Sequence, residues 1–382
     1  MNPRTITGVA TDVAGAVGVT ERGPATPTLI TGWAEFQALF GGFIDDPRFA
    51  TPYWRLPYAV RGFFENGGRQ LYVARVLDPS APAGDGDLAA FVGGTDGLSG
   101  ATGLAAVMGI PGLTLMAMPD AVVAPAFADA LLDRCETARN RVAILDGPSG
   151  ATNPASVSRR RDTAFGALYY PWLRVPAPHR PEGHVVVPPC GHVAGCLARA
   201  AVASATRVGE AAPELNGLTS GEPGRADAPL DRLVSSRDGE RLAPEGVNVI
   251  RDFRAGGRGV RLWGVRTMSS DPDWKYVNVR RLFLFLEHSI DQGTQWVAFE
   301  PNGQPTWAAV RASVETFLTD RWRAGAFVGA TTREAFFVKC DRSTMTQADL
   351  DNGRLVCQVG VAPLRPAEFV IFRIGQWTRD RP

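Results

Sequence analysis

The sequence predicts an α/β fold, α+β overall, and three observations support this prediction. Between residues 113 and 146, short apolar runs flank one amphipathic run in the order strand, helix, strand, which is typical of a layer with parallel strands. The last third of the chain carries long runs with helical hydrophobic spacing. Each end of the chain is rich in β-branched or aromatic residues. We therefore expect a central α/β layer, a C-terminal α+β domain and two extended β-strand arms.

Composition indicates a folded protein and argues against some partners. The chain has 382 residues, of which 45% are hydrophobic and 21% charged, and this length suits one large domain or two to three modest ones. Its 40 Lys and Arg residues balance 39 Asp and Glu residues. No nucleic-acid partner is expected, because a phosphate backbone attracts a clear excess of positive charge.

The cysteines and the apolar segments indicate in which cellular compartment the protein folds and whether it inserts into a membrane. Five cysteines, an odd number in a chain of this size, argue against a disulfide framework and for a reducing compartment. The segment Met1–Val19 lacks the basic and apolar regions of a secretion signal. Prolines interrupt the most apolar stretch, Leu104–Leu132, so we expect no direct membrane insertion.

The N-terminal segment is expected to form one long extended strand. Its β-branched residues are Thr5, Ile6, Thr7, Val9, Thr11, Val13, Val17 and Val19. The turn Glu21–Pro24 follows at once, so the strand has no adjacent hairpin partner. We expect it to need a sheet from elsewhere. Helices around Trp33–Phe40 and Leu56–Phe63 and a strand at Gln70–Leu77 come next.

The middle of the chain alternates between the two element types. The Pro- and Gly-rich segment 79–103 is expected to be a linker. The expected elements that follow are strands at Leu113–Met118, Val142–Leu145 and Ala167–Val175, and helices at Phe127–Arg139 and His192–Ala205.

The last third is expected to hold strands at Gly259–Thr267 and Gln295–Phe299 and helices at Asn278–Ile290 and Trp307–Trp322. The final run is apolar on both faces of an extended segment, as in a strand that lies between two neighbours. Its members are Phe369, Val370, Ile371, Phe372, Ile374 and Trp377. The chain thus begins and ends with strands that need partners.

A hydrolase is the strongest catalytic alternative. Asp146 ends an apolar strand, and Gly191-His192-Val193-Ala194-Gly195 resembles the histidine segment of subtilisin-like serine proteases. With Ser220 as nucleophile, His192 as base and Asp146 as its partner, the chain order would fit such a triad. Ser220 argues against this hypothesis, because it lies in a Gly/Pro-rich loop only 28 residues after His192 and lacks the family's serine signature.

No metal or cofactor is expected. Cys190, His192 and Cys196, with His179 and His184 upstream, are possible zinc ligands, but their spacing matches no common zinc motif. Buried cysteines are common for packing reasons alone. The acidic pairs Asp271 with Asp273 and Asp349 with Asp351 are typical of turns and helix caps.

Long runs in the last third resemble the C-terminal domain of phage tail sheath proteins, especially those of extracellular contractile injection systems. The similar runs there are Gly259–Thr267, Asp271–Ile290, Gln295–Pro301, Phe336–Asp341, Asn352–Leu355 and Pro363–Ile374. Earlier runs are also similar, namely Gly8–Gly23, Leu56–Val76, Ala143–Pro148, Leu168–Val175 and Gly191–Gly195. The middle region of this family is described as subtilisin-like in layout, which accounts for the protease-like pattern.

The resemblance implies a structural role. A sheath subunit polymerises in stacked rings around an inner tube, exchanges β-strand arms between neighbours and contracts from a metastable extended state. The implied partners are other copies of the chain, the tube protein, and baseplate and cap proteins. The implied setting is the bacterial cytoplasm during assembly, followed by a phage tail or tail-like particle.

The implied division of the chain has six parts. They are an N-terminal arm (1–20), a segment packed on the C-terminal domain (21–78), a linker (79–103), a subtilisin-like α/β domain (104–245), a C-terminal sheath domain (246–366) and a C-terminal arm (367–382).

Overall fold

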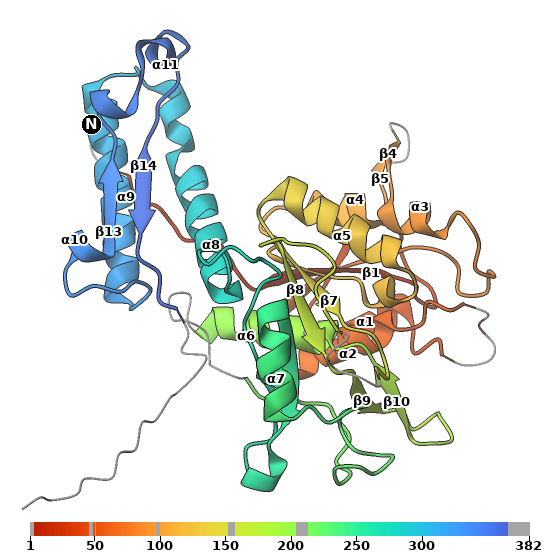
Figure 1. Cartoon of the computed structure of the whole chain (residues 1–382). Coiled ribbons are helices and arrows are strands. Elements are labelled where there is room, and N and C mark those ends of the chain that lie inside the picture. The colour runs from red at the N-terminus through yellow and green to blue at the C-terminus, as the bar shows by residue number, and fades with distance from the viewer. Residues whose placement is uncertain are drawn as a thin grey trace, which may run out of the picture.

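The computed structural model describes residues 4–45, 49, 51–96, 100–151, 157–203 and 213–365. It consists of a large α/β domain and a smaller C-terminal domain that stands to one side of it (Figure 1). The predicted α/β class is confirmed. Within the described ranges, no helix combines the length and apolar character that a bilayer crossing requires.

A mixed sheet of eight strands forms the centre of the α/β domain, as far as the chain is described. Its strand order is β12-β11-β8-β7-β6-β1-β3-β2. The six inner strands are parallel, and β2 and β12 run antiparallel at the two edges. The bounds are β1 Val13–Gly18, β2 Thr28–Ile30, β3 Gln70–Arg75, β6 Leu115–Ala117, β7 Val142–Asp146, β8 Gly166–Tyr170, β11 Val247–Asp252 and β12 Val260–Trp263.

Strand β1 lies inside this sheet, between β3 and β6. All six of its residues are buried. Val13 and Val17 face one hydrophobic core, and Ala14 and Ala16 face the other. The expectation of one partnerless strand over Thr5–Val19 is therefore wrong from Val13 onward, because the chain's own strands pair with this segment.

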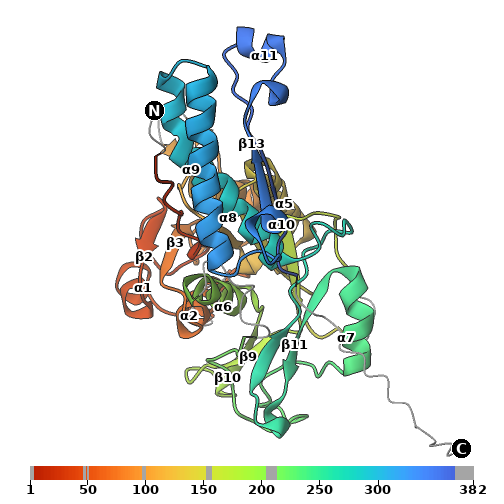
Figure 2. The same cartoon turned by 90° about the vertical axis from the view of Figure 1, so that its left-hand side faces the viewer.

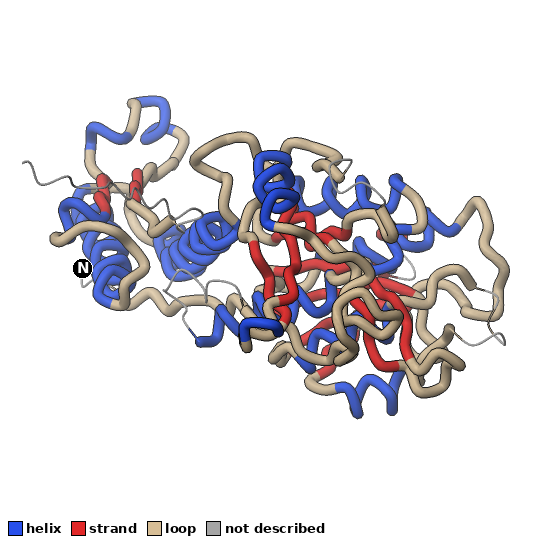
Figure 3. Tube along the Cα trace, turned by 60° about the horizontal axis from the view of Figure 1, so that its bottom comes forward, coloured by secondary structure: helices blue, strands red, loops and turns tan. Residues whose placement is uncertain are grey.

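Helices cover both faces of the sheet, as Figure 3 shows. One core contains residues from α1, α2 and α6, and the other contains residues from α3, α4 and α5. The bounds of the helices in this domain are α1 Trp33–Phe40, α2 Leu56–Glu65, α3 Asp87–Val92, α4 Gly103–Met108, α5 Pro125–Ala138, α6 Cys190–Ala203 and α7 Ser236–Leu242, with 3₁₀ turns η1 Pro119–Val122, η3 Ala243–Glu245 and η4 Arg254–Gly256.

The C-terminal domain is built on two long helices that lie side by side (Figure 2). Its elements are α8 Val277–Thr294, η5 Gln295–Phe299, α9 Gln304–Arg323, α10 Thr332–Ala335, β13 Phe336–Lys339, η6 Arg342–Thr344, α11 Gln347–Asp351 and β14 Gln358–Val361. Helix α8 contributes to two cores. Val277 and Leu284 pack in the α/β domain, whereas Phe285 and Leu286 pack with α9.

Several sequence expectations need correction. Segment 21–78 contributes β2 and β3 to the central sheet, so it is not a separate unit packed on the C-terminal domain. Segment 79–103 is not only a linker, because it contains α3 and a hairpin of β4 Thr95–Asp96 and β5 Gly100–Ala101. Phe91 of α3 is fully buried. The expected strand at Gln295–Phe299 is the 3₁₀ turn η5.

The expected strand Ala167–Val175 is divided into two elements. Strand β8 ends at Tyr170, and β9 Leu173–Pro176 pairs antiparallel with β10 His184–Val187 in a separate two-stranded sheet.

Helices α2 and α6 pack at close range because α6 presents glycines to α2. A Cβ at Gly191 would lie 2.3 Å from the carbonyl oxygen of Ala59, and a Cβ at Gly195 would lie 2.3 Å from that of Phe63. The protease-like Gly-His-Val-Ala-Gly motif is thus a helix-packing motif in this fold.

We expect Gly191→Ala to lower the free energy of unfolding by about 1–3 kcal/mol, because the added methyl forces α2 and α6 apart. Gly86→Ala is the matched control, since a Cβ there meets no atom within 4 Å. Chemical denaturation measures both variants. Equal stability of the two variants would show that the contact between α2 and α6 has room for an added methyl group.

Candidate assembly site

The structure separates the three residues of the hypothetical catalytic triad. Asp146 ends β7 and accepts a 2.8 Å hydrogen bond from the backbone N–H of Cys190, at the start of α6. Both ring nitrogens of His192 are buried and have no hydrogen-bond partner among the described residues. Ser220 is exposed, and its carbonyl accepts a hydrogen bond from Arg254. Asp146 and His192 therefore do not form the Asp–His hydrogen bond that orients the imidazole in such a triad.

Burial controls the protonation of these groups. It lowers the pKa of His192 to about 3, so the imidazole is neutral at ordinary pH. Burial also raises the pKa of Asp146 to about 7. The ring of His192 instead packs against α2, where a Cβ at Gly62 would lie 2.3 Å from the imidazole. His192 is a packing residue in this fold.

The candidate metal ligands also have other roles. Across the described ranges, no group of three or more His, Cys, Asp or Glu side chains is placed to hold a metal ion. The Cys196 thiol contacts Asn66. Asp349 caps α11 through Thr346, and Asp271 accepts a hydrogen bond from the N–H of Asp273 in a turn, as their sequence context predicts.

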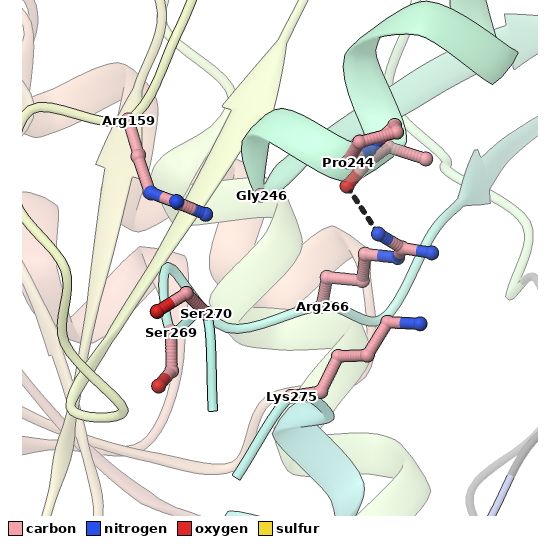
Figure 4. Close-up of a pocket in the computed structure, with 8 residues that line it drawn as sticks. Arg159, Pro244, Gly246, Arg266, Ser269, Ser270 and Lys275 are labelled. Carbon is pink, nitrogen blue, oxygen red and sulfur yellow. Dashed lines mark hydrogen bonds between the residues drawn. The ribbon is translucent and has the colours of Figure 1, made fainter. Parts of the chain in front are cut away.

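A small basic pocket lies between η3 and the segment before α8 (Figure 4). Arg159, Arg266 and Lys275 contribute its positive charge, and Ser269 and Ser270 contribute hydroxyls. Arg266 donates a hydrogen bond to the carbonyl of Ala243. The residues that line the pocket include no carboxylate and no imidazole.

The strongest candidate for a functional surface is the two-stranded antiparallel sheet of β13 and β14, which we call the assembly sheet. Its register pairs Phe336 with Val361 and Lys339 with Gln358. The sheet stands next to α9 in Figure 1. The sequence pattern does not pair these two strands, although the short apolar run Phe336–Val338 is a signal for the first.

One face of the assembly sheet is anchored in the C-terminal core. Phe336, Val338 and Val361 pack against this core. The ring centroids of Phe336 and Phe327 lie 6.3 Å apart. On the opposite face, Phe337 is 59% exposed and covers Gly360, where a Cβ would lie 2.1 Å from its ring. Because isolated two-stranded sheets are marginal in water, this anchoring is needed for the sheet to persist.

The outer edges of the assembly sheet are open over most of their length. Within the described residues, β13 pairs only with β14, and β14 only with β13. A single bridge between Phe327 and Pro363 follows β14, and Val328 donates a backbone hydrogen bond to Ala362. Unpaired strand edges offer rows of N–H and C=O groups that can accept a strand from another chain.

The N-terminal segment 4–12 lies along the same domain without forming a strand. Its backbone N–H groups donate to buried serines on two helices, from Arg4 to Ser313 of α9 at 2.9 Å and from Val9 to Ser289 of α8 at 3.1 Å. Ile6 is 6% exposed and packs over Gly293, where a Cβ would lie 2.7 Å away. Of the predicted arm residues, Thr5, Ile6, Thr7, Val9 and Thr11 lie in this segment, whereas Val13, Val17 and Val19 lie in the core of the α/β domain.

Partly buried Arg281 of α8 links this segment to the α/β domain. Its guanidinium donates to the carbonyl of Thr11 at 2.8 Å and to that of Leu197 of α6 at 2.9 Å. Burial lowers the pKa of Arg281 to about 10. Because this value is still well above neutral pH, the guanidinium keeps its charge. The predicted C-terminal arm residues Phe369, Val370, Ile371, Phe372, Ile374 and Trp377 lie outside the described residues.

Comparison with known proteins identifies phage tail sheath proteins as relatives of this chain. Residues 269–376 match the family model of the phage tail sheath C-terminal domain. The chain is 24% identical over 329 residues to a putative prophage major tail sheath protein of Pseudomonas aeruginosa, with 81% of this chain and 79% of that protein covered. A shorter stretch of 132 residues is 26% identical to the tail sheath protein of Enterobacteria phage T4, of which it covers 19%.

Solved structures extend the similarity to nearly the whole chain. The anti-feeding prophage helical sheath in its contracted state matches with a TM-score of 0.76 at 28% identity, over 97% of this chain and 95% of that one. The sheath complex of the extracellular contractile injection system PVC, also contracted, matches with a TM-score of 0.75 at 26% identity, over 100% and 96%. The resemblance that the sequence indicates is confirmed.

The partly buried Asp146 gives a testable pH dependence. Its pKa is raised from 3.8 to about 7 in the folded protein, so its contribution to stability is full below about pH 4 and is lost as the pH rises through about 7. The expected slope is at most about 1.4 kcal/mol per pH unit. Asp146→Asn should remove this part of the pH dependence in denaturation experiments.

Asp162→Asn is the control, because hydrogen bonds from Ser270 lower the pKa of Asp162 and its contribution has the opposite sign. A variant Asp146→Asn with unchanged pH dependence would contradict the assignment of Asp146 as a partly protonated helix cap with a raised pKa.

Proposed function

We propose that this chain, which carries a phage tail sheath C-terminal domain and has the fold of contractile-system sheath subunits, polymerises helically around an inner tube and contracts to drive that tube into a target. The observation that carries this proposal is the assembly sheet, whose two outer edges pair with no other strand among the residues that the structure describes. The similarity to sheath subunits in assembled, contracted particles supports it.

Strand addition is the proposed link between copies. Residues 367–382 would extend from one copy and add a strand to the β13 or β14 edge of another, with backbone hydrogen bonds giving strength and alternate side chains fixing the register. The apolar character of Phe369, Val370, Ile371, Phe372, Ile374 and Trp377 suits a strand that lies against a core.

The N-terminal segment 4–12 is a second proposed link. Its contacts with Ser289, Ser313 and Gly293 are made within one chain here. The same contacts can form with the C-terminal domain of a neighbour if the segment is exchanged, because identical copies present identical docking sites.

The proposed contraction needs rigid subunits joined by extended tethers. Helix α8 fixes the C-terminal domain to the α/β domain, so subunits can rotate as bodies while the tethers stay paired. The free energy for contraction would be stored at assembly in the metastable extended lattice, without nucleotide hydrolysis.

The proposed partners are further copies of the chain, an inner tube protein, a baseplate and a cap protein. Matches to sheath subunits support further copies of the chain as partners, and the match to an anti-feeding prophage baseplate assembly supports a baseplate. The proposed course is assembly in the bacterial cytoplasm and function in a phage tail or an extracellular tail-like particle. The relatives are structural tail proteins, which favours a mechanical over an enzymatic role.

Removal of residues 366–382 tests the strand link. We expect a folded, soluble monomer that forms no tubes or rings under negative-stain electron microscopy, whereas the full chain forms them. A deletion of Met1–Val19 is unsuitable, because it removes β1 from the central sheet. Normal tubes from the C-terminal truncation would refute strand addition by this segment.

A proline on β13 tests the sheet edge directly. The N–H of Ala362 donates to the carbonyl of Ala335, and antiparallel alternation then directs the N–H of Val338 away from β14. We expect Val338→Pro to block tube formation, because proline removes the outward donor. Val338→Ala is the matched control that loses the same side chain but keeps the N–H. Tubes from Val338→Pro would show that this edge accepts no strand.

A further inference from the structure

Two cysteines face each other at the end of the assembly sheet. Cys340 directly follows β13 and Cys357 directly precedes β14. The register that pairs Lys339 with Gln358 places Cys340 opposite Cys357 when it is continued by one residue. Residues opposite each other in antiparallel strands have Cα atoms about 4.5–5.5 Å apart, within the range of about 4.4–6.8 Å that a disulfide spans.

The two thiols already interact. Their interaction lowers the pKa of Cys357 and raises that of Cys340. Cys340 is 2% exposed and belongs to the C-terminal core, whereas Cys357 is only partly buried at its margin. The more accessible thiol is therefore also the one whose reactive thiolate form is favoured.

We propose that Cys340 and Cys357 form a reversible disulfide that locks β13 to β14 when the protein meets an oxidising environment. Both thiols are free in this structure. The pairing itself follows from the register and the interaction of the two thiols. Its role in holding the assembly sheet rests on the proposed function.

The oxidant is a low-molecular-weight disulfide. The Cys357 thiolate attacks one sulfur of that disulfide, which forms a mixed disulfide and releases one small thiolate. The Cys340 thiol then loses its proton to solvent and attacks the Cys357 sulfur, which closes the protein disulfide and releases the second small thiolate. Two protein thiols are oxidised, and one small disulfide is reduced to two thiols. An excess of small thiol reverses both steps.

The position of this bond determines what it stabilises. It would close the connection through η6 and α11 at its base and hold the first paired residues, Lys339 and Gln358, in register. Both thiols lie on the core side of the sheet, the side of Phe336 and Val338, because side chains alternate along a strand. The outer edges that we propose accept strands are left free.

The other three cysteines provide an internal comparison. Cys135 lies on α5, and Cys190 and Cys196 lie on α6, all buried in the α/β domain. Burial raises the pKa of Cys135 to about 12, which makes it a poor nucleophile. We expect these three to stay reduced under conditions that oxidise the pair.

The test uses the full chain, reduced, freed of reductant and incubated with oxidised glutathione. Remaining thiols are alkylated after denaturation, and the protein is digested with trypsin without reduction. We expect a linked species that joins the peptide Cys340–Arg342 to the peptide beginning at Leu355, together with the loss of two of the five alkylatable thiols. Dithiothreitol should restore both.

Two variants sharpen the result. Cys340→Ser should trap glutathione on Cys357, because the resolving thiol is missing, and Cys357→Ser should give neither product. Circular dichroism confirms that both variants fold. A wild-type chain that carries glutathione on Cys357 without the link, links other cysteines or stays fully reduced would overturn the proposal. Tube formation is scored separately by microscopy, so failure of the proposed function does not alter this readout.

Discussion

The shared burial of helix α8 is the constraint on which the molecule depends. The first half of α8 packs in the α/β domain through Val277 and Leu284, and its second half packs with α9 through Phe285 and Leu286. At the junction, partly buried Arg281 donates to carbonyls of α6 and of the N-terminal segment. A helix is stiff over this length, so the orientation of the C-terminal domain relative to the central sheet is fixed by packing and by paired polar groups rather than by a linker.

Because the two domains are rigidly joined, the assembly sheet has a fixed position in each subunit. A two-stranded sheet is marginal in water, and this one persists because Phe336, Val338 and Val361 pack against the C-terminal core. Its edges are consequently presented in a defined direction from each subunit. If neighbours add strands to these edges, the packing of α8 in both domains sets the geometry of every link. Only the extended segments that join the subunits then need to bend.

Sequence patterns predicted most elements but placed some of them wrongly. The helices α2, α5, α6, α8 and α9 follow from their apolar spacing. The sequence does not reveal that β1 belongs to the central sheet, because its partners, β3 and β6, are distant in sequence and parallel pairing leaves no local turn signal. The apolar run Gln295–Phe299 resembles a strand, yet it continues α8 as a 3₁₀ turn. Asp146 and His192 mimic a catalytic pair because a helix cap and a helix-packing histidine occupy the same layout.

A helical cryo-electron microscopy reconstruction of tubes assembled from the full chain tests the central claim most directly. The account predicts that at least one outer edge of β13–β14 carries a backbone-paired strand built from residues 367–382 of another copy, while α8 keeps its place in both cores. Tubes in which both edges remain bare, and copies touch only through side chains of their α/β domains, would contradict it.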